Sequence, residues 1–298
     1  MYYRRKILLA LLSLFDGKLT AKQFQKLLFL FTRQQETKSF DFVPYRYGCF
    51  SFQANQDMLT LTRYGLCDIT ETENGRFYKL NKDEGFFEML SNDDKRYLLE
   101  TKKQFGNFSQ TNLIRYTYQK YPYYAIKSTI AKDLLNAQEL KEIEKQKRHF
   151  DEKQLFTIGY EGISLETYIN KLIINDVQVL CDVRKNAYSQ KYGFSKKTLS
   201  LACKGANIDY LHIPDLGIVS DKRQELHTQK DYDMLFDEYN KTTLVENNAS
   251  LLIIRKLLDE GKRVALTCFE KNPKQCHRSC VSHSLMQLPN ADYNLKLL

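Results

Sequence analysis

Hydrophobic residues in the first third of the chain recur mostly at helical spacing. Three helices are predicted there, over residues 3–15, 21–33 and 53–64. Thr20 can cap the second helix, and Gly65 can end the third. In the third helix we expect the inward side chains to be Met58, Leu59 and Leu61. The first helix has a basic start followed by leucines, as a signal peptide does, but no small-residue cleavage site follows, so we interpret it as a core helix.

Two strand-like segments come after the helices. Residues 67–72 and 76–80 alternate polar and apolar side chains around Asn74-Gly75, a pair typical of a tight hairpin turn. Helices followed by a hairpin give the outline of a winged helix. An α+β domain of this kind is therefore predicted over residues 1–82.

This first domain resembles the winged helix-turn-helix domains that accompany bacterial nucleic-acid-processing and defence proteins, notably in Lys26–Leu30 and Tyr45–Gly48. A nucleic-acid partner is expected, DNA rather than RNA. The expected phosphate contacts are Arg63, Arg76 and Lys79, and the expected base contacts are Gln53, Asn55 and Gln56. Winged helices also mediate protein contacts, so a homodimer is the alternative use of this domain.

A helical extension is predicted over residues 83–150. Its helices are expected over residues 83–100, 110–121 and 131–148. Tyrosines gather beside cations around Pro122: Tyr116, Tyr118, Tyr121, Tyr123 and Tyr124. Such a cluster can stack bases, or it can pack the end of a helix, which is the commoner arrangement.

Strand and helix patterns alternate from residue 151 onward. Strands are predicted over residues 154–159, 177–184, 208–214 and 263–269. Helices are predicted over residues 164–175, 194–204, 251–260 and 277–287. Strand, helix and strand at this spacing indicate parallel pairing with right-handed crossovers. Residues 151–298 are therefore predicted to be an α/β domain with a mainly parallel sheet flanked by helices.

Charge separates the two halves of the chain. The net charge is +9, and the first 150 residues hold 25 Lys and Arg against 17 Asp and Glu, which leaves the remainder nearly neutral. A basic half joined to a neutral half suggests that the first binds a polyanion and the second acts on a ligand. No uninterrupted apolar run reaches the roughly 18 residues of a membrane span. Seven widely spaced cysteines favour a reducing cytoplasm over a disulfide framework.

Polar side chains collect where the predicted strands end. Asp182 and Arg184 are two positions apart, as are Cys268 and Glu270, so each pair points to one side of its strand. If the strands are neighbours, these acids and cations converge with Arg278. Such a group can bind phosphate or sugar and use one carboxylate in catalysis, or it can be a buried ion-pair network. Tyr160, Ser189 and Gly159 complete the predicted ligand-binding set.

Four blocks of the second half resemble the bacterial family called domain of unknown function 488. They are Thr157–Tyr160, Leu180–Arg184, Tyr210–Gly217 and Cys268–Glu270 with Cys276-His277-Arg278. The resemblance covers residues 154–288 and implies a compact α/β domain with a polar site built from these blocks, occurring near nucleic-acid and stress-response systems. The loop Lys185–Ser189 departs from relatives, which often carry a proline before the serine.

The cysteines allow two further chemistries. Cys276 precedes His277 at a helix start, which would suit a nucleophilic thiolate. Cys276, Cys280 and His283 have helical spacing and could join Cys268 around a metal. No Cys-x-x-Cys pair accompanies them, so we predict neither a metal nor a cofactor.

The favoured hypothesis is a nucleic-acid-processing protein. Its first half would bind DNA or RNA, and its second half would hydrolyse or modify a nucleotide unit at a glycosidic or phosphoester bond, in bacterial defence or DNA repair. Enzyme activity is left open, because a ligand-sensing transcription regulator could use the same two halves. The expected catalytic residues are Asp182, Glu270, Tyr160, Cys268, Cys276 and His277, and the expected ligand-binding residues are Arg184, Arg278, Ser189 and Gly159.

Overall fold

The computed structural model describes residues 1–73, 75–223 and 226–298, and it divides the chain into two compact units, Met1–Lys147 and Arg148–Leu298. Each unit has its own hydrophobic core. Within the described ranges, none of the helices combines the length and the apolar character needed to cross a bilayer.

The N-terminal unit begins with the element order of a winged helix. The elements are α1 (Tyr3–Leu14), β1 (Lys18–Thr20), α2 (Ala21–Thr32), β2 (Val43–Tyr45), β3 (Gly48–Phe50), α3 (Phe52–Arg63), β4 (Cys67–Thr72) and β5 (Gly75–Leu80). Strands β1, β5 and β4 form an antiparallel sheet in that order, and β2 and β3 form a separate hairpin between α2 and α3. The predicted hairpin over 67–80 is confirmed, although its turn residue Asn74 lies outside the described residues.

Side-chain caps fix where the helices begin. Thr20 accepts a hydrogen bond from the Gln23 amide while the Gln23 side chain accepts from the Thr20 amide, which makes a capping box at α2. In α3, Met58 and Leu61 are fully buried, as predicted. The prediction for Leu59 is wrong, because it is 36% exposed. Adjacent helical residues point about 100° apart, so Leu59 cannot share the face of Met58.

Helices also make up the rest of this unit. They are α4 (Asn92–Phe105), α5 (Gln110–Lys120), η1 (Pro122–Ala125), α6 (Ala131–Leu134) and α7 (Ala137–Glu144). The predicted helix over 131–148 is wrong: the backbone is extended at Leu135, and Asn136 caps α7. The helix predicted from residue 83 begins only after Ser91, which caps α4. Tyr121 and Tyr124 pack edge-on against Phe29, as tyrosines that cover a core do.

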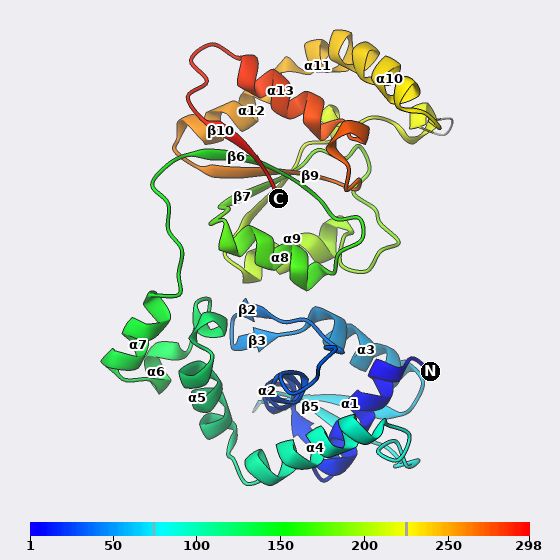
Figure 1. The fold of residues 1–298 in the computed structure, drawn as a ribbon, viewed down its shortest axis with the longest axis vertical. Coiled ribbons are helices and arrows are strands. Elements are labelled where there is room, and N and C mark those ends of the chain that lie inside the picture. The colour runs from blue at the N-terminus through cyan, green and yellow to red at the C-terminus, as the bar shows by residue number, and fades with distance from the viewer. Residues whose placement is uncertain (74, 224–225) are drawn as a thin grey trace. The chain divides into compact units, whose positions relative to one another are not determined.

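The C-terminal unit is built on one five-stranded parallel sheet, which confirms the predicted α/β class. Its strands are β6 (Gln154–Gly159), β7 (Val179–Asp182), β8 (Asp209–His212), β9 (Arg263–Cys268) and β10 (Asn294–Leu297), and their spatial order is β10-β6-β9-β7-β8. All neighbouring strands run parallel. Helices cover both faces, with α8 (Leu165–Ile174) and α9 (Lys196–Gly205) on one and α12 (Asn248–Asp259) and α13 (Arg278–Gln287) on the other (Figure 1).

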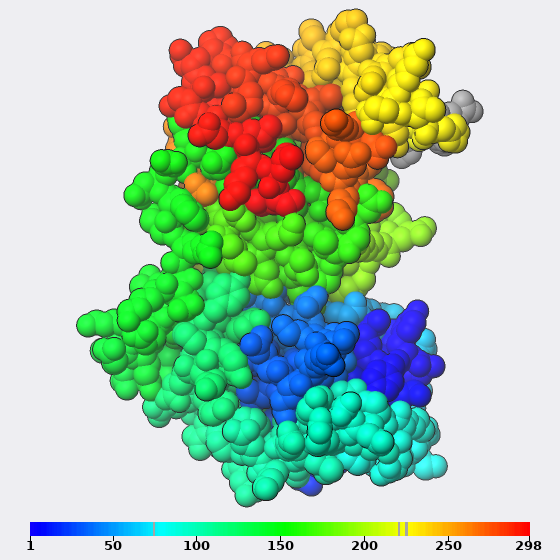
Figure 2. All heavy atoms as spheres, viewed as in Figure 1, coloured from blue at the N-terminus to red at the C-terminus, as the bar shows by residue number. Residues whose placement is uncertain are grey.

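Two parts of this unit are absent from the sequence-based prediction. Strand β10 pairs with β6 at the sheet edge, and the space-filling view shows the last residues, coloured red, at the surface (Figure 2). The helices α10 (Gln229–Lys241) and α11 (Thr243–Glu246) lie between β8 and α12 in the chain. Central strand β9 is buried along its whole length, so the ends of β6, β7 and β9 are held on a rigid base.

Candidate functional site

A crevice of about 260 Å³ opens where β6, β7 and β9 end in the C-terminal unit. Its described lining holds three cations and no carboxylate: Tyr160, Arg184, Lys185, Asn186, Tyr188, Ser189, Ile218, Arg223, Cys268, Phe269 and His277. Crevices at the carboxyl ends of parallel strands are the usual ligand sites of open α/β sheets. The lining is therefore suited to an anionic ligand.

Asp182 and Arg184 form a buried ion pair at the end of β7. The Arg184 Nε atom lies 2.8 Å from Asp182 Oδ1, and the hydroxyl of Tyr210 on β8 donates to Asp182 Oδ2 at 2.6 Å. Burial opposes the charge of Arg184, but the Asp182 carboxylate outweighs it and raises the pKa of the guanidinium. The Asp182 oxygens are thus occupied by internal donors, as in the ion-pair network that the sequence left as an alternative.

Tyr160 extends this network into the crevice. Its hydroxyl accepts a hydrogen bond from Arg184 Nη1 at 2.7 Å, and its ring stacks on Phe194 with centroids 4.2 Å apart. Burial raises the pKa of Tyr160, so it stays a neutral phenol. Ser189 contacts the Tyr160 side chain. The predicted residues Tyr160, Arg184 and Ser189 are therefore brought together.

Glu270 pairs with Arg223 rather than with Arg184 or Arg278. Burial opposes ionisation of Glu270, yet the Arg223 guanidinium lowers the pKa of this carboxyl below its ordinary value. The Cys268 thiol donates to Glu270 Oε2 at 3.2 Å. Arg223 is the last residue of the short 3-10 helix η3 (Ser220–Arg223), which is too short to show a periodic pattern, so no sequence pattern marked it as a site residue.

Arg278 is not exposed to the crevice, because it is only 2% accessible and donates to the backbone carbonyls of Glu270 and Lys271. The expectation that it binds phosphate is therefore not matched by its position. Its guanidinium instead holds the loop after β9 against the start of α13.

Gly159 has a structural role, because a Cβ there would lie 1.9 Å from the Glu270 carbonyl oxygen. The glycine lets β6 and this loop approach closely.

Cys268, Cys276 and His277 meet at the wall of the crevice, which the first and the last of them line. All three are buried, and one donor atom from each lies within 4.8 Å of the others. Cys280 and His283 do not belong to this group, so the four-residue cluster that the sequence allowed is not formed. It assumed that Cys276 lies on the last helix, but Cys276 is extended and α13 begins only at Arg278.

Comparison with known families finds a match in the C-terminal unit. Residues 164–285 match the family model described as domain of unknown function DUF488. The C-terminal part of the chain is a DUF488 domain. The matched segment contains Asp182, Arg184, Glu270 and the Cys268–Cys276–His277 group. No curated protein and no solved structure matches the chain.

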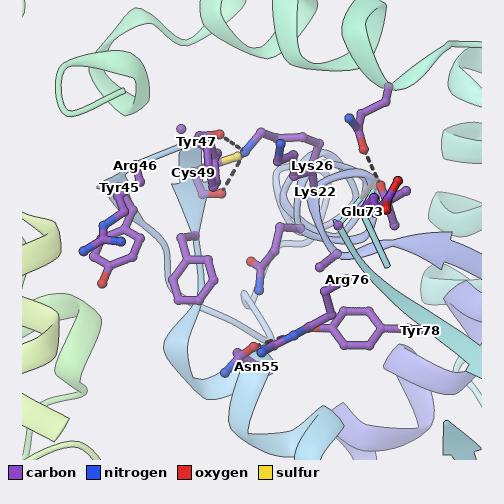
Figure 3. Close-up of a pocket in the computed structure, with 17 residues that line it drawn as sticks. Lys22, Lys26, Tyr45, Arg46, Tyr47, Cys49, Asn55, Glu73, Arg76 and Tyr78 are labelled. Carbon is purple, nitrogen blue, oxygen red and sulfur yellow. Dashed lines mark hydrogen bonds between the residues drawn. The ribbon is translucent and has the colours of Figure 1, made fainter. Parts of the chain in front are cut away.

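The N-terminal unit, outside the DUF488 domain, has a larger pocket of about 650 Å³. Figure 3 shows side chains from α2, the β2–β3 hairpin and β5 around it. Its described lining includes four cations and one carboxylate residue: Lys22, Lys26, Arg46, Arg76 and Glu73. Aromatic residues interleave with them: Tyr45, Tyr47, Phe50 and Tyr78. This is the side-chain mixture that single-stranded nucleic-acid sites use.

Lys26 is a buried residue in the lining of this pocket. The side chain is only 1% exposed, and Nζ donates to the backbone carbonyls of Tyr47 and Cys49, as Figure 3 shows. Burial lowers the pKa of Lys26. Lys22, one turn earlier, lies 4.3 Å from the centroid of the Tyr47 ring. The two lysines thus position the turn of the β2–β3 hairpin beside α2.

Only some of the residues predicted to contact nucleic acid line this pocket. Arg76 and Asn55 line the pocket, whereas Gln53 bonds the buried Asp57. The remaining three, Arg63, Lys79 and Gln56, lie outside the described lining, on α3 and β5. Sequence reasoning missed Lys22 and Arg46. The signal for Arg46 was present in Tyr45-Arg46-Tyr47, an aromatic and cationic alternation that had contributed only to the winged-helix resemblance.

Proposed function

We propose that this protein binds nucleic acid, preferentially DNA, through the N-terminal pocket and that the DUF488 domain acts on a phosphate-bearing nucleotide unit. The observation that carries the first part is the excess of cations over acids in the N-terminal pocket, combined with its tyrosines. Phosphates favour such a surface electrostatically, and bases stack on aromatic rings.

The crevice of the DUF488 domain supports the second part of the proposal. Arg184, Lys185 and Arg223 line a space of about 260 Å³, which suits a phosphate or a small sugar phosphate. Glu270 is the proposed catalytic carboxylate, since both of its side-chain partners, Arg223 and Cys268, line the crevice, whereas Asp182 also accepts from Tyr210, which lies outside the lining. The reaction class proposed is hydrolysis of a glycosidic or phosphoester bond, with Glu270 activating water and Arg184 and Arg223 holding the anion.

A second candidate function is a ligand-sensing regulator without turnover. The mutual pairing of Asp182, Arg184 and Tyr210 favours it, because a saturated network is better suited to holding a ligand than to transferring protons. The two functions differ in one measurement. If the domain is an enzyme, incubation with DNA, RNA and nucleotides should yield a product, and the Glu270→Gln variant should not form it. If the domain is a sensor, the ligand should only raise the thermal stability of the protein.

The binding half is tested by fluorescence anisotropy with a labelled single strand and the matching duplex, between about 50 and 200 mM salt. We expect log affinity to fall linearly with log salt. The triple variant Lys22→Ser, Arg46→Ser, Arg76→Ser should lower the slope by about 2.7 on the duplex and about 2.1 on the single strand, from about 0.9 and about 0.7 for each lost phosphate contact. Binding that is absent, or that does not depend on salt, would overturn the proposal.

A matched control uses three exposed cations of the same unit that do not line the pocket. Lys82, Lys103 and Lys120 serve for this purpose. Their replacement by serine makes the same change in net charge, so it separates a local site from general attraction to a basic domain. Equal losses in the two triple variants would assign the binding to net charge and not to the pocket.

A further inference from the structure

The chain has seven free cysteines, and two of them occupy a different kind of site from the others. Cys268 and Cys276 lie together with His277, one donor atom of each within 4.8 Å of the others, and all three are at most 2% exposed. Cys181 and Cys203, by contrast, pack in the sheet and in α9, outside this cluster. Buried sulfur and imidazole groups at this separation match the ligand types that bind zinc.

The tautomer of His277 supports this assignment. Its Nε2 atom lies 2.9 Å from the backbone carbonyl of Val183, which can only accept a hydrogen bond, so Nε2 carries the proton. Nδ1 is then left with its lone pair and faces Cys268 Sγ at 3.8 Å. A histidine that ligates a metal through one nitrogen usually donates from the other nitrogen to a carbonyl or carboxylate in this way.

The backbone holds the three side chains in place. Cys268 ends central strand β9 and pairs in register with Gly159 of β6. Cys276 and His277 lie just before α13, where Arg278 donates to the carbonyl of Glu270 and so closes the loop between the two cysteines. A site whose ligands come from a strand end and an anchored helix start is preorganised for binding.

The charges are compatible with a divalent ion. Binding would release the two thiol protons, and two thiolates with one divalent cation form a neutral centre, which suits a buried position. Glu270 contacts both thiols and is already neutralised by Arg223.

We propose that Cys268, Cys276 and His277 bind one thiophilic divalent cation, with zinc as the best chemical fit. Three protein ligands leave one position of a tetrahedral site open, which is the arrangement of catalytic zinc. Cys268 and His277 line the crevice, so that position belongs to the side on which Arg184 and Arg223 would hold an anion. The proposal does not rest on nucleic-acid binding by the N-terminal unit.

The test is a Co²⁺ titration of the reduced, metal-stripped full chain, followed by absorption spectroscopy, together with elemental analysis of the protein as purified. We expect about one equivalent of bound metal, thiolate-to-cobalt charge-transfer bands and intense tetrahedral d–d bands, all removed by excess Zn²⁺. No binding, or cobalt bands without a thiolate contribution, would overturn the proposal.

Variants locate the site. Cys268→Ser, Cys276→Ser and His277→Ala should each lose the tetrahedral cobalt spectrum, whereas the matched controls Cys181→Ser and Cys203→Ser should retain it. Should a variant misfold, the native chain still decides: Zn²⁺ should protect Cys268 and Cys276 from alkylation, as read by peptide mass spectrometry. Unchanged alkylation of both cysteines, or a Cys268–Cys276 disulfide that forms whether or not Zn²⁺ is present, would contradict the assignment.

Discussion

The two pockets use their charged side chains in opposite ways. In the DUF488 crevice, Arg184 is paired with Asp182 and Arg223 with Glu270. In the N-terminal pocket Arg76 pairs with the exposed Glu71, but no ion pair joins Lys22 or Arg46 to a carboxylate within the part of the chain that the structure describes. The arginines of the crevice are held in fixed positions by their carboxylates, as a site for one small ligand requires. The positive charges of Lys22 and Arg46 in the N-terminal pocket would instead be neutralised by a bound partner. Removing a charge should therefore affect folding in the first and binding in the second.

The largest expected effect is on stability, from Asp182→Ala. The change leaves the Arg184 guanidinium buried without its carboxylate, and breaking such a pair typically costs about 3–5 kcal/mol. Urea unfolding followed by circular dichroism measures it. The control Asp237→Ala removes an exposed partner of Lys241 and should cost no more than about 0.5 kcal/mol. Similar losses from both substitutions would remove the distinction between the two kinds of charge.

Tyr210→Phe tests the same network by removing a single hydroxyl group. The hydroxyl donates to the buried Asp182 carboxylate at 2.6 Å, and a hydrogen bond to a charged group contributes about 1.5–3 kcal/mol. The free energy of unfolding should fall by that amount. Tyr188→Phe, at a site 71% exposed, should leave it unchanged. A neutral outcome for Tyr210→Phe would mean that Asp182 does not depend on this donor.

Lys26 is the exception in the N-terminal pocket, because it is buried. We therefore expect it to make the free energy of unfolding depend on pH. Burial lowers its pKa in the folded state below the ordinary value of 10.5, so folding favours the neutral amine. The stability of the native chain relative to Lys26→Met should rise with pH above the lowered pKa and level off near 10.5. Unfolding free energies of both proteins from about pH 7 upward measure this. A difference that falls with pH would contradict the sign.

The smallest expected effect on stability is that of Arg46→Ser. The side chain is exposed on the β2–β3 turn, so the free energy of unfolding should change by less than about 0.5 kcal/mol. The same variant should weaken DNA binding and lower the salt slope by about 0.9. A large loss of stability would show that Arg46 is a structural residue and not a binding one.

Much of the fold could be predicted from periodicity, and so could part of the site. The two-residue repeat along the second strand placed Asp182 and Arg184 together, and parallel order brought Cys268 to the same edge. Local patterns could not reveal Arg223, since the 3-10 helix that it ends is only four residues long and its partner Glu270 is distant in sequence. The sequence allowed a metal group of Cys268, Cys276, Cys280 and His283 and did not include His277, because hydrophobic spacing does not fix the first residue of a helix.

Sequence patterns also failed to predict where some helices begin and which of their side chains are buried. Residues 131–148 have helical composition throughout, yet Asn136 begins a new helix by capping α7 with a capping box. A capping side chain competes with helix continuation through one local hydrogen bond, and composition does not reveal which one forms. Lys26 is a similar case, because a lysine within an amphipathic helix is expected at the surface unless backbone carbonyls accept from it.

Hydrogen exchange with and without a saturating single-stranded oligonucleotide tests the central claim most directly, because it locates the partner on the full chain. We predict slower exchange in peptides that cover the β2–β3 hairpin, residues 43–50, and strand β5, residues 75–80, with no change in α4. Protection confined to α4 or absent from the hairpin, under conditions where anisotropy shows saturation, would contradict the claim that the N-terminal pocket binds nucleic acid.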